Sequence, residues 1–143
     1  MLHENLKLTG KLSIAINEEV VKVVDNLVVT DGKEFVASRM EGTSDAVMSH
    51  MAIGTGSTAA AAGDSALGSE SARVALTSTT VSANTVTYVA TFSAGTPASA
   101  AAITEAALFN ASSTGTMLCR TVFDVVNKGT ADSMTITWTV TVS

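Results

Sequence analysis

The stretch SMTITWTVTVS (residues 133–143) alternates apolar and polar side chains without a break. Its apolar positions are Met134, Ile136, Trp138, Val140 and Val142, and threonines occupy the positions between them. A period of two is typical of a β-strand with one buried face. We therefore expect a strand here, with Trp138 as an anchor of the hydrophobic core. An interface role for this tryptophan is the alternative.

The same alternation appears earlier in the chain. Residues 84–92 (NTVTYVATF) alternate apolar residues with threonine, and residues 72–81 (ARVALTSTTV) do so with smaller polar partners. The short segment 82–84 can reverse the chain direction, so these two strands are expected to form a hairpin.

Two further runs flank a turn. Residues 102–110 (AITEAALFN) and 116–126 (TMLCRTVFDVV) are separated by residues 111–115, where Gly115 can supply a positive φ. With the strand at 133–143, these runs predict a meander in the C-terminal part of the chain.

The N-terminal part combines a hairpin with one helix. Apolar runs on both sides of Asn17 and Glu18 predict the hairpin. In TDGKEFVASRMEG (residues 30–42), Asp31 and Glu34 have the spacing of a capping box, and Gly42 can end a helix. We expect a helix over residues 32–41, whose Phe35, Val36 and Met40 share a face.

These elements predict a mainly β fold, an antiparallel β-sandwich or a jelly-roll-like barrel with one short helix. A chain of 143 residues, of which 46% are hydrophobic, fits a single domain. We expect the domain to span residues 1–143, with an N-terminal arm at residues 1–9 and a long surface loop at residues 54–71. Such a loop exceeds the usual connection length and is typical of a contact surface.

Charge and composition disfavour several classes of protein. The net charge of −5 and only eight Lys and Arg residues leave no basic face for nucleic acid. The start of the sequence lacks the pattern of a secretory signal, and no apolar run is long enough to span a membrane, so a soluble protein is expected. Cys119 is the only cysteine, which rules out an internal disulfide, and its surroundings favour a buried side chain.

The glycine-rich stretch IGTGSTAAAAGD (residues 53–64) invites comparison with phosphate-binding loops. It lacks the lysine of a Walker loop, and Gly63 and Gly68 interrupt the helix that a dinucleotide site requires. We therefore interpret it as a surface loop that contacts another protein. The candidate contact residues are Gly54, Thr55, Gly56, Ser57, Thr58, Asp64 and Ser65.

One carboxylate interrupts an apolar run. Glu105 lies within AITEAALFN, and a buried carboxylate needs a partner. Arg120 lies on the strand expected beside it, so we predict a structural ion pair that fixes the strand register.

No pattern in the sequence predicts catalysis, a metal or a cofactor. His50 lies within an expected strand rather than in a nucleophile or metal motif. Asp64 and Glu70 could approach a calcium ion, but two acids in a serine-rich loop are more typical of solvated side chains.

The chain as a whole resembles small virion structural proteins of tailed bacteriophages. The resemblance extends from about residue 10 to the end, through NLVVTDGKEFVASRM, MSHMAIGTGSTAAAAGDSALGSE, RVALTSTTV, ITEAALFNASSTGTMLCRTVF and VNKGTADSMTITWTVTVS. The segment that contains ITEAALFN also resembles a module of tail-collar and tail-fibre proteins.

The resemblance implies a non-enzymatic β-rich protein that assembles in many copies on a phage particle. A capsid decoration, or cement, protein is the first expectation. It would be made in the host cytoplasm, bind the major capsid protein on the outer surface of the virion as a homotrimer, and stabilise the capsid by bridging neighbouring subunits. A tail, collar, baseplate or fibre-associated protein, with a role in receptor binding, is the alternative. Nucleic-acid and membrane partners are not expected.

Overall fold

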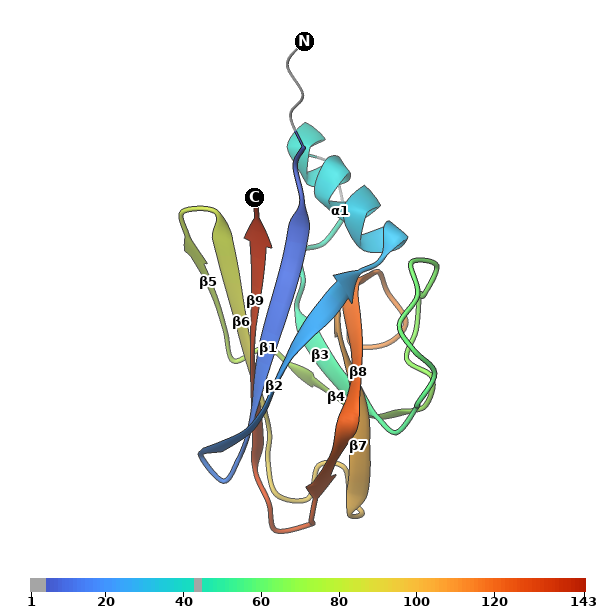
Figure 1. Ribbon diagram of the computed structural model, residues 1–143, viewed down its shortest axis with the longest axis vertical. Coiled ribbons are helices and arrows are strands. Elements are labelled where there is room, and N and C mark those ends of the chain that lie inside the picture. Colours follow the sequence, from blue (N-terminus) through green and yellow to red (C-terminus); the bar gives the residue numbers. More distant parts are fainter. Residues whose placement is uncertain (1–4, 43–44) are drawn as a thin grey trace.

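The strands form one strongly curled antiparallel sheet. A computed structural model describes residues 5–42 and 45–143, and these residues form nine strands and one helix. The sheet order is β4-β3-β7-β8-β2-β1-β9-β6-β5, and the sheet curls into a half-barrel (Figure 1). The elements are β1 (Leu8–Ile16), β2 (Glu19–Val28), α1 (Thr30–Glu41), β3 (His50–Gly54), β4 (Glu70–Ala75), β5 (Ser78–Ser82), β6 (Thr85–Phe92), β7 (Ala101–Phe109), β8 (Met117–Lys128) and β9 (Met134–Val142). The predicted mainly β class with one short helix is confirmed.

Strand β9 shows how the alternating pattern builds the core. Its apolar side chains from Met134 to Val140 are buried, whereas the threonines between them are half-buried on the opposite face. On that face the hydroxyls of Thr91 and Thr135 lie 3.0 Å apart, which links β6 to β9. Trp138 is fully buried in the main hydrophobic cluster.

The two edges of the sheet are joined by a very short connection. Only Leu76 and Thr77 separate β4 from β5, which are opposite edge strands. The Leu76 amide donates to the Ser49 carbonyl beside β3, and the Thr77 amide donates to the Val89 carbonyl of β6. The prediction of one continuous strand over residues 72–81 is therefore wrong, because the chain crosses here from one edge of the sheet to the other.

The C-terminal strands do not form a simple meander either. Strands β7 and β8 pair as expected, but β9 pairs with β1 and β6. The hairpin at Asn17 and Glu18 does form, since both residues adopt positive φ angles of 50° and 71°. Strand β2 is thereby placed between β1 and β8 and joins the two halves of the sheet.

The helix begins earlier than predicted and lacks the predicted cap. It spans Thr30–Glu41, and its N-cap is Val29 with no side-chain capping bond, so Asp31 lies inside the first turn. Gly42 ends the helix with a φ of 75°, as its position in the sequence indicated. Phe35 is buried, but Met40 is 85% exposed, so the predicted shared face was wrong at that residue. In an otherwise polar helix, packing on the sheet fixes the buried face.

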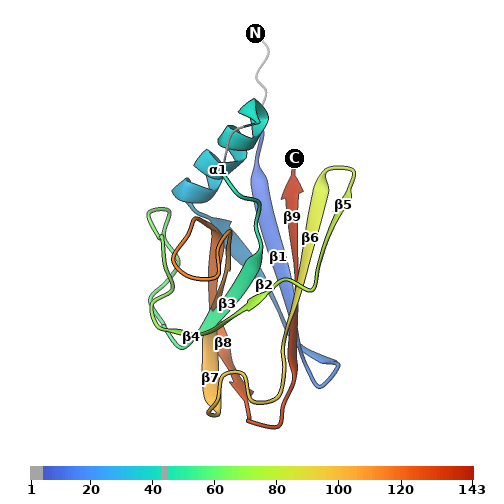
Figure 2. The same cartoon turned by 180° about the vertical axis from the view of Figure 1, so that it is seen from behind.

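The last residues of the predicted N-terminal arm, residues 1–9, belong to the sheet instead. Lys7 and Ser143 exchange two backbone hydrogen bonds, and β1 begins at Leu8. Residues 1–4 of that arm lie outside the described residues. Figure 2 shows β1 and β9 side by side. Helix α1 lies at the end of the sheet where β1 begins and β9 ends.

Gly32 sets the distance between α1 and the sheet. A Cβ atom at this position would lie 2.0 Å from the Leu118 carbonyl oxygen of β8. We expect Gly32→Ala to lower the free energy of unfolding by about 1–3 kcal/mol, because the helix must move off the sheet. Urea denaturation would measure this change.

Gly63→Ala is the matched control for that substitution, because a Cβ atom there meets nothing within 4 Å. It should change stability by no more than about 0.5 kcal/mol. Equal effects at the two positions would show that contact with β8 is not what excludes a side chain at Gly32.

Candidate functional site

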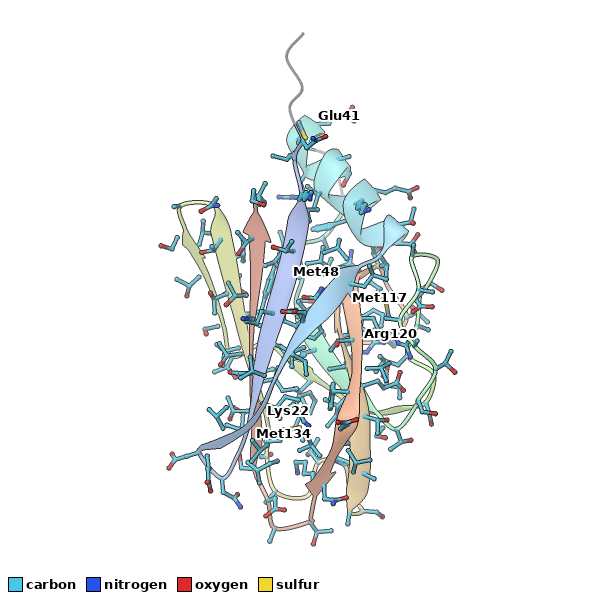
Figure 3. All side chains as sticks on the ribbon, viewed as in Figure 1. Lys22, Glu41, Met48, Met117, Arg120 and Met134 are labelled. Carbon is cyan, nitrogen blue, oxygen red and sulfur yellow. The ribbon has the colours of Figure 1, made fainter. Side chains whose placement is uncertain are left out.

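The segment between β3 and β4 is the candidate site. It covers residues 55–69 of the predicted surface loop, and it lies against the outer side of β7 and β8 (Figure 1). Figure 3 places Arg120 on β8, on the side that faces this segment. We call residues 55–69 the contact loop.

Glu105 of β7 holds the contact loop through backbone amides. Its carboxylate is fully buried and accepts hydrogen bonds from the Gly56, Gly68 and Ser69 amides at 2.7, 2.8 and 2.7 Å. These donors come from the two ends of the loop. One side chain therefore ties both ends of the loop to the sheet.

Arg120 supplies the countercharge and a further set of bonds. Its Nη2 donates to a Glu105 carboxylate oxygen at 2.9 Å and to the Thr58 carbonyl at 2.9 Å. Its Nη1 donates to the Asp64 carboxylate at 2.8 Å. The Arg120 side chain is only 3% exposed and the Glu105 side chain is fully buried, so this ion pair is shielded from water, whereas the Asp64 side chain is 23% exposed. We call Glu105, Arg120 and Asp64 the anchor.

Close packing against Glu105 explains the glycine at position 56 of the contact loop. A Cβ atom at Gly56 would lie 2.4 Å from a carboxylate oxygen of Glu105, so a larger residue cannot occupy this position without displacing the loop or the Glu105 carboxylate. The Gly56 carbonyl also accepts a hydrogen bond from the Thr104 hydroxyl at 2.7 Å. The glycine-rich sequence thus brings the loop backbone against a buried acid rather than against a phosphate.

The anchor also lowers the pKa of both carboxyl groups. Burial alone would raise the pKa of Glu105, but hydrogen bonds from Ser69, Gly68, Arg120 and Gly56 outweigh it, so the pKa lies below its ordinary value of 4.5. Burial opposes ionisation of Asp64 as well, yet bonds from the Ala61 amide and Arg120 lower its pKa below 3.8. Both groups are therefore charged at neutral pH.

We expect the anchor to contribute stability that acid removes. Because the folded-state pKa of Glu105 is below its unfolded value, its contribution is complete above about 4.5 and is lost as the pH falls through the lowered pKa. Urea denaturation over a series of pH values should show stability falling in this acid range. The Glu105→Gln variant should show a smaller fall, and identical pH profiles would contradict the assignment.

No family model, curated protein or solved structure in the comparisons matches this chain.

The structure divides the predicted contact residues into two groups. Gly54 and Gly56 lie against Glu105 and Asp64 is part of the anchor, whereas four of the predicted residues are exposed: Thr55, Ser57, Thr58 and Ser65. The predicted ion pair between Glu105 and Arg120 does form, with 2.9 Å between Glu105 Oε1 and Arg120 Nη2. The sequence-based prediction missed Gly68 and Ser69, because amide donation by the backbone leaves almost no trace in side-chain identity, and it missed Thr104, whose hydroxyl donates to the Gly56 carbonyl of a loop distant in sequence. The one hint in the sequence to this backbone site is the Gly68–Ser69 pair directly before β4.

The other titratable candidates form no convergent cluster. Glu70, considered above with Asp64 for calcium, pairs with Arg73 at 2.7 Å, and the His50 ring lies 2.8 Å from the Ser49 hydroxyl. Cys119 is fully buried, and burial raises the pKa of its thiol. Across residues 5–42 and 45–143, His, Cys, Asp and Glu side chains form no group of three that could hold a metal. In the same residues no helix is long and apolar enough to cross a membrane.

An apolar groove opens at the end of the sheet that carries α1. It has a volume of about 430 Å³ and lies between α1 and the β5–β6 hairpin. Phe35, Met48, Tyr88 and Val140 line it, and Val81 on its rim is 71% exposed. Burial raises the pKa of Tyr88 to about 12, so its phenol remains neutral.

Proposed function

We propose that this chain is a non-enzymatic structural protein of a phage virion that decorates the outer surface of the capsid. In this role it binds the major capsid protein, acts as a homotrimer and bridges neighbouring capsid subunits. A ligand that binds only the assembled shell stabilises that shell by mass action. The resemblance of the sequence to virion structural proteins supports the proposal.

The observation that carries the proposal is the anchored contact loop. Its two ends are bound to one buried carboxylate, and its middle is bound to Arg120 through Asp64 and the Thr58 carbonyl. A loop that is already ordered loses little conformational entropy on binding. Its exposed side chains between Ser57 and Ala66 are small and uncharged, which suits close contact with a flat protein surface.

The first experiment is the copy number of the chain in virions, measured by quantitative mass spectrometry on separated heads and tails. We expect a number comparable to that of the major capsid protein, recovered with heads. A few copies recovered with tails would instead assign it to the tail, collar, baseplate or fibre. Absence from both fractions would overturn the virion assignment.

A charge placed on the contact loop should weaken binding to the shell. Ser57 and Ser65 are exposed on this loop, and we expect Ser57→Lys with Ser65→Lys to weaken shell binding at least about tenfold, because a buried unpaired charge is costly. Ser112→Lys, on the exposed β7–β8 turn, is the matched control and should bind normally. Cosedimentation with undecorated capsids measures both. Equal binding by both proteins would show that the contact loop does not face the shell.

A further inference from the structure

Strands β2 and β8 are neighbours along only a small part of their length. They comprise 10 and 12 residues, yet only Leu27 with Arg120 and Val28 with Cys119 are paired between them. The Thr121 hydroxyl adds a bond to the Asp25 carbonyl at 2.8 Å. Beyond this point the two strands diverge, as Figure 1 shows, although β2 remains paired with β1 and β8 with β7.

The divergence leaves two strand edges facing an open wedge inside the sheet. We define the wedge as the space between residues 19–25 of β2 and residues 122–127 of β8. A groove of about 290 Å³ lies within it, bounded by Val21 and Lys22 on one side and by Val125 and Asn127 on the other. Unpaired strand edges are sites where another extended chain can add main-chain hydrogen bonds.

Exposed valines lie on both strands that border the wedge, and Val21 and Val125 line its groove. Val20, Val21 and Val23 of β2 are 61%, 48% and 55% exposed, and Val125 of β8 is 53% exposed. Most large apolar side chains on the described strands are buried, so these exposed valines are unusual for the molecule. Apolar side chains beside a free edge favour pairing with another strand, since the pairing would cover them.

The charges around the wedge favour a basic occupant. Glu18, Glu19, Asp25 and Asp124 are exposed there, and none of them takes part in a side-chain hydrogen bond or ion pair within residues 5–42 and 45–143. The nearby cations are Lys22 and Lys11, the latter opposite Asp25, while Lys128 is buried against the Ser93 and Asp132 carbonyls. A second copy of this acidic chain would bring like charges together, which argues against self-pairing.

We propose that the wedge accepts an extended segment of a partner protein whose valine-like side chains alternate with lysine or arginine. The segment pairs with the free edge of β2 over residues 19–25. Its apolar side chains cover Val21 and Val125 in the groove, and its basic side chains, on the opposite face of the added strand, lie near Asp25 and Asp124, which do not line the groove. This strand acceptor is separate from the contact loop and does not depend on the location of the protein in a virion.

A synthetic peptide of sequence KVKVKVK, blocked at both ends, tests the proposal on the full chain. We expect it to shift the amide resonances of residues 19–25 and to slow their hydrogen exchange about tenfold or more. The peptide EVEVEVE should do neither. Failure of KVKVKVK to bind, equal binding of both peptides, or protection confined to β5 would overturn the proposal.

Two lysine substitutions locate the site. Val21→Lys should weaken peptide binding about tenfold or more, whereas Val81→Lys on the exposed edge strand β5 should leave it unchanged. Both valines are exposed, so both variants should fold, and urea denaturation would verify this. Sedimentation of the free protein provides the remaining check. A concentration-dependent dimer that Val21→Lys abolishes would show that a second copy is the occupant and would overturn the assignment to a basic partner.

Discussion

Replacing Glu105 by glutamine is expected to lower the free energy of unfolding by about 3–5 kcal/mol. The substitution keeps the size of the side chain but removes one of the two carboxylate charges that balance Arg120, whose side chain is only 3% exposed, and leaves Asp64 as its remaining countercharge. It also replaces a carboxylate that accepts three amide hydrogen bonds with a group that is a poorer acceptor. Urea denaturation at neutral pH measures the loss. Hydrogen exchange at Gly56, Gly68 and Ser69 should accelerate by more than global unfolding accounts for.

Glu70→Gln is the matched control for this prediction. Glu70 also pairs with an arginine, Arg73, but its side chain is 36% exposed. Exposed ion pairs contribute little, so we expect a change of at most about 1 kcal/mol. If the two glutamine variants were equally stable, burial of the anchor would not be what makes it strong.

Replacing Trp138 by alanine should cost about 3–5 kcal/mol of stability. The tryptophan is fully buried, and it faces Leu12 on β1 and Tyr88 on β6 across the ladder. The substitution to alanine leaves a large cavity in the core beside β9. It also removes the hydrogen bond of 3.0 Å that the indole Nε1 donates to the Asn26 side-chain oxygen. Thermal or urea unfolding measures the effect.

Trp138→Phe separates the packing from the hydrogen bond. It keeps an aromatic ring in the core but leaves the Asn26 oxygen without its donor, while the Asn26 Nδ2 already has no partner in the described structure. We expect an intermediate loss of about 1–3 kcal/mol. A loss of less than about 1 kcal/mol for the alanine variant would show that Trp138 is not an anchor of the core.

The amino-acid pattern alone was sufficient for the parts of the fold that depend on neighbouring residues. The alternation at 133–143 predicted a strand and the buried face of Trp138, because side chains on a strand point alternately to its two faces. Asn17 and Glu18 between two apolar runs predicted the first hairpin. The isolated Glu105 within an apolar run predicted a need for a countercharge, and Arg120 on the adjacent strand supplies it.

The tertiary structure decided how those pieces are used. Nothing in residues 72–81 signals that the chain changes sheet edge at Leu76 and Thr77, since either edge presents the same local pattern. Asp31 does not cap the helix. The first turn begins after Val29 instead and packs through Gly32 on Leu118 of β8.

The anchor and the wedge depend on the tertiary structure in the same way. Glu105 binds the contact loop through amides distant in sequence, and β2 diverges from β8 beyond residues 27 and 28. Backbone groups are the same at every non-proline residue. The sequence by itself therefore determined which side chains must be buried or paired, and only the assembled sheet determined which main-chain groups meet them.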